Sequence, residues 1–146
     1  MRSALNAVYM LLGGLVLGAC SSSSVTVPAG EQTVRLQVIS PQIVRVSVSP
    51  DGRFPDRKSL AVLPQEGYKD YKTERTDGKV VLRTSALSVE VSTSDGRVQF
   101  FRADGTPLAL DGHARFQPIE VEGKEAWSTT ASFASAVDEA YYGLGQ

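Results

Sequence analysis

Apolar and polar residues alternate along much of the chain, and this period of two constrains the fold more than any other feature. In residues 33–38 and 44–48, valine or leucine occupies every second position. The pattern returns in residues 79–83, 87–91 and 97–102. Successive side chains of an extended chain point to opposite faces, so this alternation predicts strands that each bury one face.

Asp-Gly pairs separate these segments, at positions 51–52, 77–78, 95–96, 104–105 and 111–112. Both residues tolerate positive φ, so such a pair between two alternating segments is a strong signal for a tight hairpin turn. We find no stretch of ten or more residues with a sustained helical period. The sequence therefore predicts an all-β domain, an antiparallel β-sandwich.

Two segments are less regular. We predict that residues 53–71 form a loop with a short strand at residues 60–63, and that residues 129–133 form a strand whose Phe133 packs inward. Trp127 and the tyrosines have the shape of sugar-stacking platforms. In a small β core, however, aromatic residues more commonly pack in the interior or at its rim.

The first twenty residues have the features of a secretory signal. Arg2 supplies a positive charge, and the mostly apolar residues 4–16 fall short of the roughly 20 that a permanent membrane span needs. Residues 17–20, Leu-Gly-Ala-Cys, resemble the bacterial lipobox, which implies that residues 1–19 are removed and Cys20 is acylated. An ordinary signal peptide with an incidental cysteine is the alternative.

Residues 20–32 begin with a run of serines and continue with small and turn-forming residues. This composition predicts a flexible tether between the lipidated Cys20 and a folded domain at residues 33–146. Acyl chains contribute ~0.8 kcal/mol per buried methylene, so several chains would hold the protein at a membrane. We therefore expect a bacterial lipoprotein at the cell envelope, at the outer membrane or its periplasmic face.

The composition argues against several classes of function. Fifteen basic against sixteen acidic residues leave no positive excess for nucleic acid. One cysteine and one histidine form no metal-ligand set, and no glycine-rich phosphate loop or dinucleotide fingerprint is present. His113 follows the Asp-Gly pair at 111–112, so we predict an exposed turn histidine with no activated serine nearby. We expect no cofactor, no metal and no nucleic-acid partner.

Asp138 and Glu139 are adjacent carboxylates. Glycosidases hold two carboxyl groups across the scissile bond, ~5–5.5 Å apart in retaining enzymes and ~6.5–9.5 Å in inverting ones. Neighbouring side chains of an extended chain point to opposite faces, so these two would not converge on one sugar ring. We predict a structural role for them, such as capping turn amides or pairing with an arginine.

Three stretches together resemble the N-terminal region of glycoside hydrolase family 31, the α-glucosidase and α-xylosidase group. "VRLQVISPQIVRVSVSPDGRF" is similar to the opening strands of that region, and "ALSVEVSTSDGRVQFFRADGTPLAL" to its next strand pair. "FASAVDEAYYGLGQ" resembles the motif that closes the family's N-terminal sandwich. The three stretches follow the family's order and cover residues 34–146.

The resemblance implies a galactose-mutarotase-like β-sandwich. In the family, the catalytic nucleophile and acid/base are aspartates of a following (β/α) barrel, which no part of this chain resembles, so no catalytic residue is carried over. The positions that match the closing motif are Asp138, Glu139, Tyr142, Gly143, Leu144 and Gly145. The resemblance implies that these residues have a structural role at the sandwich–barrel junction.

We therefore expect the N-terminal, carbohydrate-associated domain of an enzyme that hydrolyses α-glucosides or α-xylosides, inactive without its barrel. A free-standing carbohydrate-binding sandwich is one alternative, and it would need exposed aromatic residues on one face. An active sugar mutarotase is another. It would need histidine acid chemistry together with a carboxylate base, which a single turn histidine does not favour.

Overall fold

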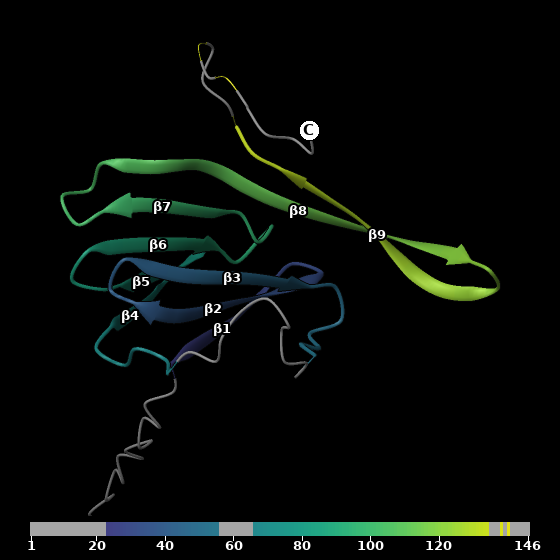
Figure 1. Ribbon diagram of the computed structural model, residues 1–146, viewed down its shortest axis with the longest axis horizontal. Helices are drawn as coiled ribbons and strands as arrows, with labels where there is room; N and C mark the ends of the chain where they lie inside the picture. The colour runs from purple at the N-terminus through teal and green to yellow at the C-terminus, as the bar shows by residue number, and fades with distance from the viewer. Residues whose placement is uncertain (1–22, 56–65, 135–137, 139, 141–146) are drawn as a thin grey trace, which may run out of the picture.

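The computed structural model describes residues 23–55, 66–134, 138 and 140, and these form two antiparallel sheets (Figure 1). The smaller sheet has the order β1-β2-β3 and the larger the order β4-β5-β6-β7-β8-β9. The strands of the smaller sheet are β1 (Ser24–Ala29), β2 (Gln32–Ser40) and β3 (Ile43–Ser49). Those of the larger are β4 (Lys72–Thr76), β5 (Lys79–Arg83), β6 (Leu87–Ser92), β7 (Val98–Arg102), β8 (Pro107–Val121) and β9 (Lys124–Ser132).

The core lies between the two sheets and is built almost entirely of valine and leucine. In β1, β2, β5 and β6 the core residues occupy alternate positions, as the period of two predicts. Burial of one such side chain contributes roughly 1.5–3 kcal/mol before the entropy of folding is subtracted. The buried core residues are Val27, Ala29, Val34, Leu36, Val38, Val80, Leu82, Val89, Val91 and Val98.

The sequence predicts five of the strands closely. Alternation in residues 33–38, 44–48, 79–83, 87–91 and 97–102 corresponds to β2, β3, β5, β6 and β7. Four of the Asp-Gly pairs also form bends or turns, in which the glycines at 52, 78, 96 and 105 have φ between 72° and 86°. The prediction of an all-β antiparallel fold is confirmed.

The first strand corrects the expected tether. Residues 20–32 were predicted to be flexible, but Ser24–Ala29 forms β1 and its Val27 and Ala29 are buried in the core. Every second residue from Val25 onward is apolar, which is the same signal as in β2, but neighbouring serines, a threonine and Pro28 obscure it. Pro28 is exposed and lies on an outer strand of the small sheet, where a missing N–H costs no ladder hydrogen bond.

Strands β4 and β8 were not predicted. The Asp-Gly pair at 111–112 is wrong as a turn, because both residues lie inside β8. Gly112 pairs with Val98 of β7, so the strand continues, with an irregular register, where a hairpin was expected. Strand β4 has no alternation because all five of its residues are exposed. The strand expected at residues 60–63 lies outside the described residues.

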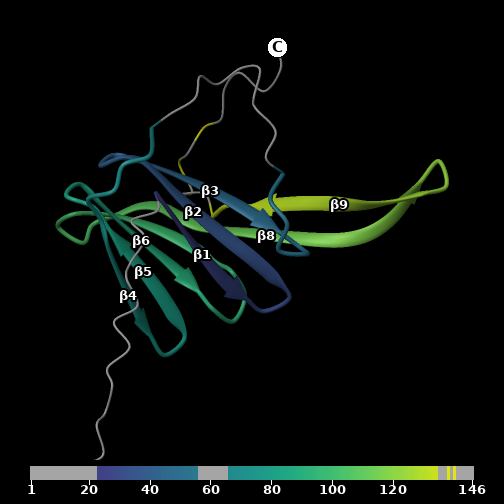
Figure 2. The same cartoon turned by 90° about the horizontal axis from the view of Figure 1, so that it is seen from below.

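Strands β8 and β9 form a long hairpin that projects beyond the two-sheet body (Figures 1 and 2). Its pairing is continuous from His113–Ser132 to Val121–Lys124, and Glu122 and Gly123 make the turn with positive φ. The expectation that Phe133 packs inward is wrong, since its side chain is 72% exposed. It lies just beyond the end of β9, and its ring is beside Gly112.

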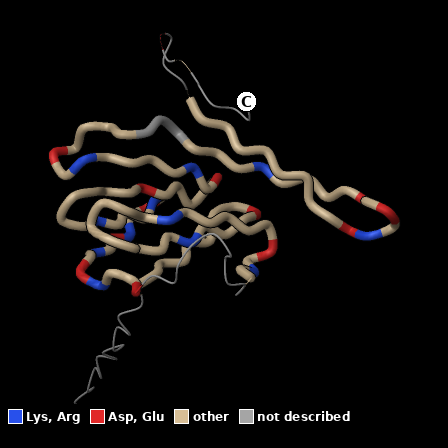
Figure 3. The backbone as a smooth tube through the Cα atoms, viewed as in Figure 1, with Lys and Arg blue, Asp and Glu red and all other residues tan. Residues whose placement is uncertain are grey.

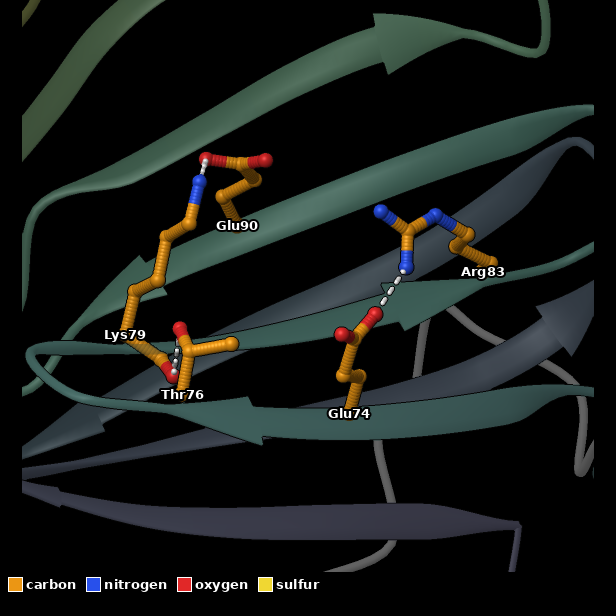
Figure 4. A network of polar contacts seen from close by, with 5 residues as sticks. All are labelled: Glu74, Thr76, Lys79, Arg83 and Glu90. Atoms are coloured by element: carbon orange, nitrogen blue, oxygen red, sulfur yellow. Dashed lines mark hydrogen bonds and ion pairs between the residues drawn. The ribbon is translucent and has the colours of Figure 1, made fainter.

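On the outer face of the large sheet, Val81 is buried at 2% exposure. Val81 lies opposite Glu74 of β4 and Glu90 of β6. These carboxylates form ion pairs with Arg83 and Lys79, both at 2.8 Å (Figure 4). The aliphatic parts of such long side chains cover apolar surface while their charged ends stay in water.

Candidate functional site

An open groove of 1370 Å³ lies between the β8–β9 hairpin and one end of the body. The β1–β2 turn and the β6–β7 turn form one side of it, and the hairpin forms the other. Residues that line it include Gly30, Gln32, Asp95, His113, Phe116 and Trp127.

Hydrogen bonds between turns hold the body side of the groove together. The Gly30 amide donates to the Thr93 carbonyl at 3.0 Å, and the Gln32 side-chain amide donates to the Asp95 carbonyl at 2.7 Å. The Thr93 amide in turn donates to the Gly78 carbonyl at 2.9 Å. Together these bonds connect the β1–β2, β6–β7 and β4–β5 turns, and we call this set the turn clamp.

Glycine at position 30 is required by the clamp. Its φ is +61°, and a Cβ there would lie 2.6 Å from the Ser94 carbonyl oxygen. Gly96 has φ +72°, and a Cβ there would collide with the Gln32 side-chain amide. Only glycine allows the two sheets' turns to approach this closely.

Asp95 is a carboxylate at the groove that is held by hydrogen bonds within its own turn. A hydrogen bond from the Ser92 side chain and one from the Arg97 amide hold the pKa of Asp95 below its ordinary value. The Arg97 amide lies 3.2 Å from Oδ1, and the Arg97 guanidinium 3.8 Å from Oδ2. Asp95 is therefore ionised at neutral pH and already bound within its own turn.

His113 is not the exposed turn histidine that the sequence predicted. It lies in β8, paired with Ser132 of β9, and its side chain is half-buried at the groove. Its Nδ1 atom is buried without a hydrogen-bond partner in the described part of the chain. The prediction failed because it assumed a turn at the Asp-Gly pair at 111–112, and this pair lies inside β8.

The hairpin presents polar residues and aromatic residues on opposite faces. Cross-strand partners share a face of a sheet. The pairs Arg115–Thr130 and Gln117–Ser128 therefore form a polar row, whereas Phe116–Thr129 and Pro118–Trp127 form the row on the other side. The Phe116 and Trp127 rings meet edge to face, with centroids 6.4 Å apart, and Trp127 is 50% exposed.

Few of the predicted site residues can be placed. Asp138 is exposed and lies in a turn. Cys20 and the closing-motif residues Glu139, Tyr142, Gly143, Leu144 and Gly145 lie outside the described residues. Within the described part of the chain there is no helix with the length and hydropathy of a membrane span, and no cluster of three metal-ligating side chains.

The fold and its sequence match a known family. The model of the glycosyl hydrolase 31 N-terminal galactose mutarotase-like domain matches residues 33–146. The chain belongs to this family. The resemblance that residues 34–146 carry is thereby confirmed, and the two-sheet body and its hairpin are a family 31 N-terminal domain.

Two solved structures are similar to this chain over a small part of their own length. A family 31 α-xylosidase from Xanthomonas citri is 38% identical, with a TM-score of 0.73; the match covers 85% of this chain and 14% of that one. A cycloalternan-forming enzyme from Listeria monocytogenes, solved with a pentasaccharide substrate, is 26% identical, with a TM-score of 0.48. That match covers 63% of this chain and 8% of that one. The chain thus spans about a seventh of the α-xylosidase.

Proposed function

We propose that this chain is the N-terminal domain of an α-glycosidase that hydrolyses α-glucosides or α-xylosides. The observation that carries the proposal is the match to the α-xylosidase, 38% identical over 85% of this chain. That match covers 14% of the enzyme, which supports our proposal that the activity needs further polypeptide, the catalytic barrel that the family resemblance implies. The carbohydrate partner is bound by the whole enzyme.

The described carboxylates support a non-catalytic role for the domain itself. Glu31 and Asp95 line the groove. A general acid must be protonated at the working pH, whereas the hydrogen bonds to Asp95 lower its pKa and keep it ionised. The Asp95 carboxylate is bound by Arg97 of its own turn instead, and we assign no catalytic residue to this chain.

A lipid anchor on Cys20 completes the proposal. The lipobox-like residues 17–20 and the serine run after them suggest that the enzyme is held at the cell envelope as a lipoprotein. Strand β1 begins at Ser24, so only a few residues separate the acylated cysteine from the folded body. The domain would then lie close to the membrane surface.

Activity assays test this proposal. The purified chain is expected to show no turnover of aryl α-xylosides or aryl α-glucosides, while a product of the same gene that continues through a barrel hydrolyses one of them. Hydrolysis by the chain alone that a point mutation within it abolishes would refute the assignment. In cells, Cys20→Ser is expected to remove lipid labelling; retained labelling would refute the anchor.

A free-standing carbohydrate-binding module is the second candidate, and the half-exposed Trp127 beside the groove favours it. Sugar recognition needs an aromatic platform and polar groups that converge on one ligand. The hairpin separates them onto opposite faces, which makes this candidate the weaker one. Saturable binding of xyloglucan or α-glucan oligosaccharides, lost in Trp127→Ala and kept in Ile119→Ala, would reverse this order.

A further inference from the structure

The Asp-Gly pairs that form the turns also have a covalent chemistry of their own. The glycine amide nitrogen attacks Cγ of the aspartic acid, the amide proton and the carboxyl hydroxyl leave as water, and a succinimide ring forms. Water then opens the ring. When it opens at the former main-chain carbonyl, the chain continues through Cβ and Cγ, which gives isoaspartate with no net change in composition. Acidic positions lie at several turns of the body (Figure 3), so the local geometry of each turn decides whether its pair reacts.

The attacking amide is already engaged in two of the turns. The Gly96 amide donates to the Ser92 carbonyl at 3.1 Å, and the Gly105 amide donates to the Arg102 carbonyl at 2.9 Å. The pair at 111–112 lies inside β8, where Gly112 pairs with Val98 of β7 and the backbone belongs to the sheet. Ring closure at these positions must first break existing contacts of the main chain.

The attacked carboxyl is restrained in three of the turns. Asp95 and Asp104 each accept a hydrogen bond from the main-chain amide two positions further on, at 3.2 and 2.9 Å. Asp51 accepts from the Arg53 amide at 3.0 Å and from the Ser49 hydroxyl at 2.8 Å. For Asp51 and Asp104 the bond from that amide is the main cause of a lowered pKa. A carboxylate held in its ionised form has no hydroxyl to lose as water.

The turn at 77–78 has neither restraint. It joins β4 to β5, between the paired residues Thr76 and Lys79 (Figure 4). Asp77 and Gly78 are both exposed, and among the described residues neither the Asp77 carboxylate nor the Gly78 amide has a hydrogen-bond partner. A Cβ placed on Gly78 would meet no atom within 4 Å, so there is open space for the ring.

We infer that Asp77–Gly78 is a site of spontaneous isoaspartate formation, and that it reacts faster than the turns at 51–52, 95–96 and 104–105. The reaction needs only water and the two residues themselves. It is independent of the catalytic assignment, so its failure leaves the turnover assay unaffected.

The position of this turn gives the modification a structural effect. The Gly78 carbonyl accepts the hydrogen bond from the Thr93 amide at 2.9 Å, which is one bond of the turn clamp. Isoaspartate adds one carbon to the main chain directly before Gly78, so the carbonyl is displaced from Thr93. The modified chain therefore loses the bond between the β4–β5 and β6–β7 turns.

Peptide mapping tests the selectivity. The purified chain is kept below its unfolding temperature in mildly acidic water labelled with heavy oxygen, which enters a residue each time a ring opens. A hydrogen bond to a charged group that must break first slows a step by about tenfold. Label and isoaspartate are therefore expected at residue 77 about tenfold faster than at residues 95 and 104. In urea, where the turns are lost, the positions are expected to react at similar rates.

Equal labelling of residues 77 and 104 in the folded chain would overturn the inference, as would a preference for residue 77 that persists in urea. Ser49→Ala removes one of the bonds to Asp51 and is expected to raise labelling at residue 51 severalfold while residue 77 is unchanged. Labelling at residue 51 that stays the same would show that these hydrogen bonds do not protect the turns, and would also overturn the inference.

Thermal unfolding tests the effect on the clamp. The aged chain is expected to unfold at a lower temperature than the fresh chain. Asp77→Glu keeps the charge but lengthens the side chain, which disfavours ring closure, and this variant is expected to unfold at the same temperature before and after ageing. An unchanged unfolding temperature after residue 77 has reacted would refute the link to the clamp, as would an equal decrease in Asp77→Glu.

Discussion

The two-sheet body, formed by β1–β7, and the β8–β9 hairpin are both built of paired strands, but they differ in how far they bury their apolar side chains. The body buries most of its apolar residues, as Leu36 and Leu82 at 0% exposure show, although Ile43 at the start of β3 is exposed. The outer part of the hairpin leaves Ile119 and Val121 about half exposed, although its pairing is longer than that of any strand pair in the body. Pairing alone therefore does not produce burial; a second sheet facing the first does.

This difference separates stability from interaction. An isolated two-stranded hairpin is marginally stable in water, whereas strands with a covered apolar face fold cooperatively. Most of the favourable free energy of folding comes from the body, whereas the outer hairpin exposes much of its side-chain surface to solvent. The outer hairpin is accordingly expected to open more readily than the body.

The largest effect is expected from a matched pair of truncations. Leu36→Ala removes a fully buried side chain between the sheets and is expected to lower the free energy of unfolding by about 2–5 kcal/mol. Ile119→Ala, on the hairpin at 43% exposure, is expected to change it by less than about 1 kcal/mol. Urea unfolding followed by circular dichroism at one protein concentration measures both. Equal losses would mean that body and hairpin are equally important to stability.

A second pair compares turns of the two regions. Gly30→Ala is expected to cost about 2–3 kcal/mol, because the residue has positive φ and its Cβ would meet the Ser94 carbonyl. Gly123→Ala, at the hairpin tip, has a similar φ but open space around it, and is expected to cost about 1 kcal/mol. Thermal unfolding of the two variants gives the comparison. If Gly30→Ala were the milder change, the turn clamp would not be holding the sheets.

The smallest effect concerns acid. The pKa of Asp95 is lowered in the folded chain, so its contribution to stability is present above an ordinary aspartate pKa of about 4 and is lost as the pH falls through the folded value. Asp95→Asn is therefore expected to flatten the loss of stability below about pH 4. Unfolding midpoints measured between pH 7 and pH 2.5 show the change. Unaltered steepness would exclude Asp95 as a contributor.

The sequence predicts the body well because its signals are local. Alternation and Asp-Gly turns depend on neighbouring residues, and they located β2, β3, β5, β6 and β7. Strand β1 was missed because polar residues and Pro28 interrupt its apolar positions. Strand β8 was missed because the Asp-Gly pair at 111–112 is a typical turn sequence. Only the pairing of Gly112 with β7 shows that this pair lies inside a strand.

The groove could not be predicted, since it depends on which distant segments meet. Gln32 donates a hydrogen bond to the Asp95 carbonyl, 63 positions away in the sequence, and no motif at either residue predicts this contact. Gly30 is the exception, because a glycine between two alternating segments does indicate a turn. The family resemblance was readable because it rests on ordered stretches of sequence, which need no knowledge of contacts.

The order of strands has a consequence for how the chain is made. In both sheets each strand pairs with the one synthesised just before it, without a crossover. Every pairing step therefore closes a short loop, which costs little entropy and favours rapid folding. As the chain leaves the ribosome, each new strand finds its partner already in place, and the docking of the two sheets is the step that must bridge a long stretch of sequence.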